Sequence, residues 1–338
     1  MGKTYQVKLE PVGIEFEVDE DETVLRGAFR QGLMLMHGCK EGQCAACKSF
    51  LLDGEVDLEK YSNFALNDYE KEEGWTLLCR AHAESDLVVE LINYDEEVLR
   101  DGIALQTKQM RVETLEALTH DIHRLVLSGE KLEYKPGQYV DIKIPDSDEV
   151  RSFSMANLPG HQLELMIKVY PDGKFSSLLA DGEIQEGHEL EVTGPYGVFT
   201  LRKNSDRPLL FIGGGAGMAP ILALLRSLAE QGSTRPAVYY YGARGLQDLF
   251  HQDELAELEQ RLPNFRFVPA LSECDEEEWS GEQGLITDVV ERCEEELGEV
   301  DAYLCGPPPM VDAAIALLDA KGVPESRVYH DKFTTTAP

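Results

Sequence analysis

The sequence has no long hydrophobic run and few basic residues. Its longest nearly apolar stretch, Leu209 to Leu225, is interrupted by four glycines and a proline. It therefore predicts a strand, a tight loop and a helix, and we expect no membrane segment. No apolar stretch follows Lys3, so we expect no secretory signal and a cytoplasmic protein. Lys and Arg total 31 against 63 Asp and Glu, a formal charge of −32, which argues against nucleic-acid and anionic-membrane partners.

Length and composition place the chain among ordinary folded proteins. At roughly 100–200 residues per domain, its 338 residues predict two or three domains. Hydrophobic residues make up 43% and charged residues 28% of the chain, which excludes the disordered and fibrous classes. A partner protein with a basic face suits the excess of acids better than a nucleic acid does.

The cysteines are clustered along the chain. There are seven, an odd number, and four fall between positions 39 and 79, which favours metal ligands in a reducing compartment over a disulfide framework. Cys39, Cys44 and Cys47 follow the pattern C-x4-C-x2-C, and Cys79 stands alone further on. This is the spacing of plant-type [2Fe-2S] sites, in which one tight loop supplies three thiolates. We therefore predict these four cysteines as the ligands of a [2Fe-2S] cluster.

Two other interpretations of the cysteines stay open, a structural zinc site and buried free thiols. Zinc sites usually pair their ligands in two short knuckles, and only Cys44 and Cys47 form such a pair. The surrounding runs favour a β-grasp fold, in which a helix crosses a mixed sheet. Thr4 to Val18 predicts a β-hairpin, Thr23 to Gly32 a helix, and Leu87 to Ile92 a closing strand.

Acidic residues are densest in residues 1–98, which we predict to be the plant-type [2Fe-2S] ferredoxin domain. This segment holds 9 Lys or Arg and 22 Asp or Glu, a net charge of −13. Most charge runs are solvated faces, and a docking surface for a redox partner is the sharper alternative. Both interpretations stay open at this point.

A small antiparallel β-barrel is predicted over residues 105–205. The acidic segment Asn93 to Asp101 is typical of a linker leading into it. Helix is scarce in the barrel until Phe175 to Ala180. Short β-like runs, separated by Gly, Pro and Asp turns, are Arg111 to Ala117, His123 to Leu127, Tyr139 to Ile144, Leu163 to Val169 and Glu189 to Val192.

Two motifs in the barrel suit a flavin. Arg151-Ser152-Phe153-Ser154 places a cation, an aromatic ring and hydroxyls in alternation along an extended segment. Gly173-Lys174-Phe175-Ser176-Ser177 predicts a glycine turn that opens a short helix, whose N–H groups and hydroxyls suit a pyrophosphate. Each motif alone is weak, because such residues are more often structural. Their order and separation favour flavin binding.

The last third, residues 206–338, predicts a parallel-sheet α/β domain. Pro208 to Ile212 is typical of a buried parallel strand, and a glycine loop and the helical pattern Ile221 to Leu228 follow it. The loop does not fit the G-x-G-x-x-G fingerprint. Two further strands end in Gly242-Ala243-Arg244 and in Cys305-Gly306-Pro307. The loop itself is Gly213, Gly214, Gly215, Ala216, Gly217, Met218, Ala219 and Pro220.

These three loops predict a nicotinamide dinucleotide site, because the carboxyl ends of parallel strands meet at one edge of a sheet. Taken alone, Arg244 would suit the 2′-phosphate of NADP. Taken alone, Cys305 would be a small buried residue. Both of these simpler interpretations stay open from the residues.

Together the motifs resemble the reductase components of bacterial multicomponent oxygenases over nearly the whole chain. Cys39 to Cys44, Lys60 to Leu66 and Asn93 to Glu97 look most like the reductases of soluble di-iron monooxygenases, which hydroxylate methane, propane or phenol. The resemblance implies a ferredoxin domain followed by a ferredoxin-NADP reductase-like module. It also implies [2Fe-2S], FAD and NADH as cofactors.

The resemblance further implies roles for single residues. Ser154 lies near the reactive N5 of the flavin and Cys305 near the nicotinamide, so these two are the catalytic candidates. Phe333 is similar to the C-terminal aromatic that covers the flavin, and Gly-x-Arg at Arg244 usually goes with NADH in this family. The predicted cofactor-binding set is Arg151, Ser152, Phe153, Ser154, Ile167, Lys168, Val169, Gly173, Lys174, Phe175, Ser176, Ser177, Phe333, Gly213, Gly214, Gly215, Ala216, Gly217, Met218, Pro220, Gly242, Ala243, Arg244, Cys305, Gly306 and Pro307.

By this resemblance, NADH reduces FAD, the cluster takes the electrons singly, and the acidic ferredoxin domain passes them to a di-iron hydroxylase. The linker Asn93 to Asp101 would let that domain swing. The alternatives are the reductase of a Rieske-type dioxygenase and a zinc-stabilised assembly subunit. Three departures put single contacts in question: Phe153 replaces the usual Tyr, Ala216 replaces Thr, and Thr334 to Pro338 follow Phe333.

Overall fold

The computed structural model describes residues 2–273 and 279–334, so Cys274 and residues 335–338 lie outside the described part. The chain forms two compact units. The first comprises residues up to Gln106 together with Gly194–Val198, and the second comprises Thr107–Thr193 together with Phe199 onward. None of the helices in the described ranges has both the length and the apolar character needed to span a bilayer.

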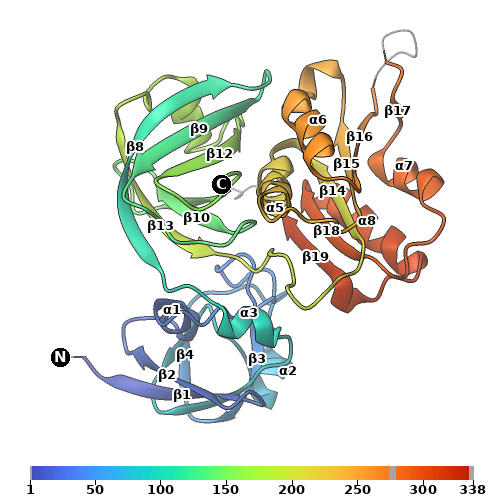
Figure 1. The fold of residues 1–338 in the computed structure, drawn as a ribbon. Helices are drawn as coiled ribbons and strands as arrows, with labels where there is room; N and C mark the ends of the chain where they lie inside the picture. Colours follow the sequence, from blue (N-terminus) through green and yellow to red (C-terminus); the bar gives the residue numbers. More distant parts are fainter. Residues whose placement is uncertain (1, 274–278, 335–338) are drawn as a thin grey trace. The chain divides into compact units, whose positions relative to one another are not determined.

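The first unit is built on a mixed sheet, and helix α1 packs against it (Figure 1). The strand order is β2-β1-β7-β3-β5, with β1 antiparallel to β2 and parallel to β7. Helix α1 begins after Thr23, whose side chain accepts the Arg26 N–H. This confirms the predicted β-grasp fold. The elements are β1 Thr4–Glu10, β2 Ile14–Asp19, α1 Val24–Arg30, β3 Lys48–Asp53, β4 Val56–Leu58, α2 Asp68–Glu73, β5 Trp75–Leu77, β6 Ala81–Ala83, β7 Leu87–Glu90 and α3 Glu96–Arg100.

The segment predicted as a linker, Asn93 to Asp101, instead contains helix α3. Its N-cap is Asp95, whose carboxylate accepts the Val98 N–H at 3.1 Å. Val98 and Leu99 are buried, Leu99 to 1% exposure, and the Leu99 carbonyl accepts the Met34 N–H at 3.4 Å. The prediction followed the acidic composition and overlooked these two apolar residues. Because they anchor α3 in the first unit, the segment is not a free tether.

The second unit begins with the antiparallel barrel, which confirms that prediction. Its strand order is β11-β10-β13-β8-β9-β12, and a bridge between Met155 and Leu165 links the two end strands, so the barrel is nearly closed. Buried aliphatic side chains such as Leu125, Val140 and Leu165 fill its interior. The elements are β8 Gln106–Ala117, β9 Ile122–Gly129, β10 Tyr139–Lys143, β11 Val150–Ser154, β12 Gln162–Lys168, α4 Ser176–Ala180 and β13 Glu189–Tyr196.

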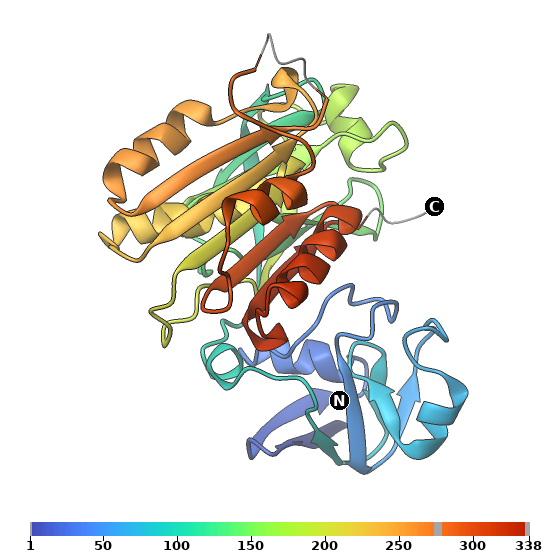
Figure 2. The same ribbon diagram turned by 90° about the vertical axis from the view of Figure 1, so that its right-hand side faces the viewer.

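A six-stranded parallel sheet follows, in the order β17-β16-β15-β14-β18-β19, which confirms the predicted α/β fold. Helices cover both faces, with α5 and α6 on one and α7 and α8 on the other (Figures 1 and 2). The elements are β14 Leu209–Gly214, η1 Gly215–Gly217, α5 Met218–Glu230, β15 Ala237–Ala243, η2 Leu246–Asp248, α6 Gln252–Arg261, β16 Phe265–Leu271, β17 Glu282–Gln283, α7 Ile286–Cys293, β18 Asp301–Gly306, α8 Pro308–Ala320, η3 Glu325–Arg327 and β19 Val328–Lys332.

Side chains of adjacent residues in the central strands pack on opposite faces of this sheet. Phe211 and Tyr239 pack toward α5 and α6, whereas Leu210 and Tyr240 pack toward α7 and α8. This two-sided burial explains the continuous apolar runs that predicted β14, β15 and β18. Strand β19 escaped prediction because it is an edge strand with His and Asp in its sequence.

We expect Leu99→Ala to lower the free energy of unfolding of the first unit by about 3 kcal/mol, because it empties a buried site. Ile92→Ala, which truncates an exposed apolar residue directly before this segment, should change it by less than about 0.5 kcal/mol. Urea unfolding followed by Trp75 fluorescence in a Trp279→Phe background measures both. Equal effects of the two substitutions would mean that α3 is not anchored.

Candidate functional site

The loop between α1 and β3 directs backbone donors at cysteine sulfur. The Sγ of Cys39 accepts N–H groups from Glu41 at 3.4 Å and Gln43 at 3.2 Å, and the Sγ of Cys44 accepts the Cys39 N–H at 3.3 Å. A hydrogen bond from Cys44, together with these loop N–H groups, lowers the pKa of Cys39 to about 5 despite its partial burial. Such donors stabilise sulfur in its anionic, metal-binding form.

The remaining ligands complete a site that is half sheltered. Cys47 and Cys79 are buried and Cys44 is exposed. Within the described residues, no three of the cysteine sulfurs gather inside 4.8 Å of one another. The side chains of Cys39 and Cys44 are hydrogen-bonded to each other, and so are those of Cys47 and Cys79. Two pairs of sulfurs suit the two irons of a [2Fe-2S] cluster.

A second segment closes over the cluster loop. Gly42 has φ +70°, and a Cβ there would lie 2.7 Å from the Cβ of Tyr61. The Ser62 N–H donates to the Gly42 carbonyl at 3.0 Å. Residues 61–66, which the sequence marks only by family resemblance, thus pack directly on the loop that carries three of the ligands.

The structure brings the two flavin motifs together. The Glu149 carboxylate accepts hydrogen bonds from Arg151 at 3.1 Å and from Lys174 at 2.5 Å. The rings of Phe153 and Phe175 lie with their centroids 5.1 Å apart. Two cations beside two aromatic rings suit the pyrophosphate and the ring system of a flavin cofactor.

Several other predicted flavin residues already have protein partners. Ser152 donates to Asp141 at 2.6 Å, Lys168 pairs with Asp121 at 2.6 Å, and the Ser176 hydroxyl accepts the Tyr170 N–H at 3.2 Å. The Val169 N–H also donates to the Asp121 carbonyl, and Ile167 is buried in the barrel core. Ser154 is buried at the end of β11. Helix α4 begins at Ser176, one residue later than predicted, so the Gly173 turn is longer than the motif suggested.

The glycine loop and the Cys305 loop meet at the carboxyl edge of the parallel sheet. Gly213 and Cys305 are register partners on β14 and β18. A Cβ on Gly217 would lie 2.2 Å from the Cys305 carbonyl oxygen, so only glycine allows this approach. Gly214 pairs in turn with Gly242, just before exposed Arg244. The predicted dinucleotide loops therefore lie on three adjacent strands.

The end of β19 adds two residues to this edge. The Phe333 N–H donates to the Gly306 carbonyl at 2.9 Å. Asp331 is the register partner of Cys305. Burial raises the pKa of the Cys305 thiol, which keeps it neutral, and raises that of the Asp331 carboxyl to about 6. Sequence reasoning missed Asp331, because the alternation along Val328–Lys332 was not identified as a strand.

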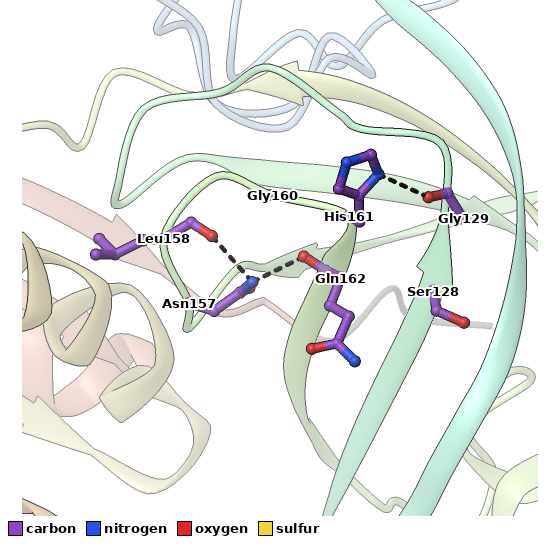
Figure 3. Close-up of a pocket in the computed structure, with 7 residues that line it drawn as sticks. All are labelled: Ser128, Gly129, Asn157, Leu158, Gly160, His161 and Gln162. Carbon is purple, nitrogen blue, oxygen red and sulfur yellow. Dashed lines mark hydrogen bonds between the residues drawn. The ribbon is translucent and has the colours of Figure 1, made fainter.

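A hollow of about 400 Å³ lies at the β11–β12 turn of the barrel (Figure 3). The Asn157 amide spans it, donating to the carbonyls of Leu158 at 3.1 Å and Gln162 at 2.7 Å, while the His161 ring contacts the Gly129 carbonyl (Figure 3). These polar groups satisfy one another. None of the predicted cofactor residues lines the hollow, so we assign it no ligand.

Three domain families match the chain and together cover most of it. Their order along the chain is the one that the sequence motifs predict. Residues 7–84 match the 2Fe-2S iron-sulfur cluster binding domain, residues 109–201 the oxidoreductase FAD-binding domain, and residues 211–315 the oxidoreductase NAD-binding domain. Fold and site together define an NAD-linked iron–sulfur flavoprotein oxidoreductase.

The chain is 51% identical to the propane 2-monooxygenase reductase component of Mycolicibacterium goodii, with 99% of each chain covered. It is 34% identical to the toluate 1,2-dioxygenase electron transfer component of Pseudomonas putida, with 95% of each covered. The crystal structure of the Amycolatopsis cytochrome P450 reductase GcoB superposes with a TM-score of 0.90 at 29% identity, covering 98% of this chain and 100% of that one. The chain belongs to the family of monooxygenase reductase components.

As a member of this family, the protein passes electrons from NADH through FAD to a [2Fe-2S] cluster. The chain supplies a separate site for each cofactor. The thiolate loop suits the cluster, the cations Arg151 and Lys174 suit the flavin pyrophosphate, and the glycine loop suits the dinucleotide. The zinc-stabilised assembly subunit is therefore not supported.

Cys44→Ala should abolish the visible [2Fe-2S] absorbance and leave the FAD content unchanged, because alanine supplies no ligand in place of the fourth thiolate. Cys293→Ala, which alters a cysteine outside the cluster loop, should leave both cofactors in place. Absorbance spectra combined with iron, sulfide and flavin analysis distinguish these outcomes. A purified protein containing one zinc and no sulfide would contradict the assignment.

Asp331 should make stability depend on pH. The folded protein holds this proton up to about pH 6, whereas the unfolded chain releases it near the ordinary pKa of 3.8. Rising pH between these values therefore favours the unfolded state, and we expect the holoprotein to lose about 1 kcal/mol of unfolding free energy between pH 5 and pH 7. Asp331→Asn should lack this fall.

Urea unfolding at pH 5, 6 and 7 measures the effect. Asp319→Asn, which alters an exposed carboxylate on α8, serves as the control and should keep the wild-type pH dependence. If Asp331→Asn shows the same fall as the wild type, another group is responsible.

Proposed function

We propose that the electrons leave from the cluster end of the first unit to the hydroxylase component of a soluble di-iron monooxygenase. The support is twofold. A relative named as a propane 2-monooxygenase reductase component is 51% identical over the full chain, and the segment that packs on the cluster loop carries an exposed aromatic residue.

The observation that carries the proposal is the exposure of Phe64. Its side chain is 91% exposed, the largest value among the exposed large hydrophobic residues of the described chain. It lies in the segment whose Ser62 N–H donates to Gly42 of the cluster loop, and its own N–H donates to the Ser62 hydroxyl at 3.2 Å. A large aromatic ring held in water by ordered backbone is typical of an interface anchor.

Acidic residues accompany this aromatic ring. Glu41 in the cluster loop and Asp68 at the start of α2 are exposed, and Tyr69 is 68% exposed. No Lys or Arg occurs between Tyr61 and Glu70. An apolar anchor with negative neighbours suits a partner that presents an apolar pocket with a basic rim. The docking patch is defined here as Glu41, Phe64, Asp68 and Tyr69.

The second candidate acceptor is the oxygenase of a Rieske-type dioxygenase. The P. putida electron transfer component named for toluate dioxygenase supports it, at 34% identity over nearly the whole chain. The higher identity to the propane-type relative favours the di-iron acceptor. The module order is common to both, so only reconstitution separates them.

We assign the cofactor roles as part of the same proposal. Arg151 and Lys174 bind the flavin pyrophosphate, Phe153 packs on the flavin, and Ser154 and Cys305 line the place where nicotinamide and flavin meet. When bound, FAD takes two electrons from NADH and releases them singly to the cluster. The chain needs no general acid for this, so its contribution is to orient the two rings and exclude water. Boundaries at 1–98, 105–205 and 206–338 and a cytoplasmic location belong to the proposal as well.

Phe64→Ala should raise the concentration of di-iron hydroxylase needed for half-maximal NADH-driven hydroxylation about thirtyfold, because truncating an interface anchor costs about 2 kcal/mol. Leu285→Ala, which truncates a 63% exposed leucine of the second unit, should leave it unchanged. NADH-driven reduction of ferricyanide should be the same in both variants. A propane monooxygenase hydroxylase is the acceptor to use.

If Phe64→Ala reaches half-maximal hydroxylation at the same hydroxylase concentration as the wild type, the docking patch is contradicted. A Rieske oxygenase component that reaches half-saturation at a lower concentration than the di-iron hydroxylase would contradict the acceptor and leave the patch in place.

A further inference from the structure

One guanidinium in the second unit joins the flavin barrel to the dinucleotide sheet. Arg226, on α5, donates through Nη1 to the Ala156 carbonyl and to Glu164, each at 2.8 Å. Its Nε and Nη2 donate to the two carboxylate oxygens of Glu254 on α6, at 2.6 and 2.9 Å. Ala156 and Glu164 belong to the barrel, whereas Glu254 belongs to the dinucleotide part.

The residues joined by this contact lie close in the chain to the two predicted cofactor segments, the flavin strand β11 and the glycine loop. Ala156 stands two residues after Ser154, at the end of β11, and its N–H donates to the Glu164 carbonyl. Helix α5 starts at Met218, directly after Gly217 of the glycine loop. Arg226 lies eight residues further on, about 12 Å along the helix axis at ~1.5 Å per residue. A shift of α5 against the barrel would therefore move the dinucleotide loop relative to the flavin strand.

The barrel side of the contact is held by its own hydrogen bonds. The Asn157 side chain accepts the Glu164 N–H at 2.8 Å. It also donates to the Leu158 and Gln162 carbonyls (Figure 3). Arg124 donates to the other Glu164 oxygen at 3.0 Å. Arg226 thus meets a rigid acceptor pair, the Ala156 carbonyl and a carboxylate already fixed in place.

Burial makes the contact specific. The Arg226 side chain is 19% exposed and that of Glu164 10%. Burial alone would raise the pKa of Glu254, but hydrogen bonds from His251 and Arg226 hold it at about 2. The carboxylate therefore stays charged at working pH. Because the planar guanidinium donates to four oxygens on three residues in fixed directions, a lysine cannot replace it.

We propose that Arg226 is a positioning residue for hydride transfer, fixing the dinucleotide loop against the flavin strand. Transfer requires reacting atoms about 3–3.5 Å apart, and a displacement of about 1 Å can cost about a hundredfold in rate. The proposal rests on the NADH-to-FAD step that the family carries out, and it is independent of the acceptor and of the docking patch.

The test is anaerobic stopped-flow reduction of the full-length, FAD-loaded protein by NADH. Arg226→Lys should slow flavin reduction at saturating NADH about tenfold and Arg226→Met about a hundredfold, with the Kd for NADH within about twofold of wild type. The long-wavelength absorbance of the nicotinamide–flavin pair should weaken in parallel. In the absence of NADH, backbone amides of residues 156–164 should exchange faster in Arg226→Met.

Arg235→Met is the matched control. Arg235 is also buried and pairs with Asp301 at 2.7 Å, but its carboxylate partner lies on β18, in the dinucleotide sheet itself. This variant should lose thermal stability yet reduce its flavin within about twofold of the wild-type rate. If Arg226→Met does not retain FAD, Arg226→Lys and Glu254→Gln provide the same comparison.

Wild-type flavin reduction in Arg226→Lys and Glu254→Gln would overturn the proposal. It would also be overturned by an effect confined to the Kd for NADH, or by an equal slowing in Arg235→Met, which would indicate a general loss of stability.

Discussion

The cofactor sites of this protein depend on two glycines whose backbone lies so close to neighbouring residues that no side chain would fit at either position. At the dinucleotide edge, Gly217 lies against the Cys305 carbonyl, where a Cβ would be 2.2 Å away. At the cluster loop, a Cβ on Gly42 would lie 2.7 Å from the Cβ of Tyr61. On either side of Gly42, the N–H groups of Glu41 and Gln43 donate to the Cys39 sulfur, which stabilises its anionic form. The strands and helices around them serve to hold these two loops in place.

Charge is used in opposite ways on the surface and in the interior. The first unit carries a large excess of acids, and several of them near the cluster loop, such as Glu41 and Asp68, are exposed to solvent. Inside the second unit, charge occurs as paired groups such as Glu164, Arg226 and Glu254. Exposed charge sets which partners approach, whereas paired buried charge sets the geometry between two parts of the fold.

Much of the fold was predictable because its signals are local. The C-x4-C-x2-C loop, the glycine turn after Ile212 and the apolar runs of β14, β15 and β18 each lie within a few consecutive residues. Edge strand β19 and helix α3 were missed for the converse reason. Their apolar residues are few, and their burial depends on neighbours distant in the chain.

The sequence alone determined which chemistries are present, because ligand spacing and loop composition are properties of adjacent residues. Four thiolates, a flavin motif pair and a glycine loop can be identified without coordinates. Only the tertiary structure decided which residues meet: Glu149 between Arg151 and Lys174, Asp331 beside Cys305, and Arg226 against Ala156. These contacts join residues separated by up to 70 positions, and such pairings follow from how the strands and helices pack and not from any local pattern.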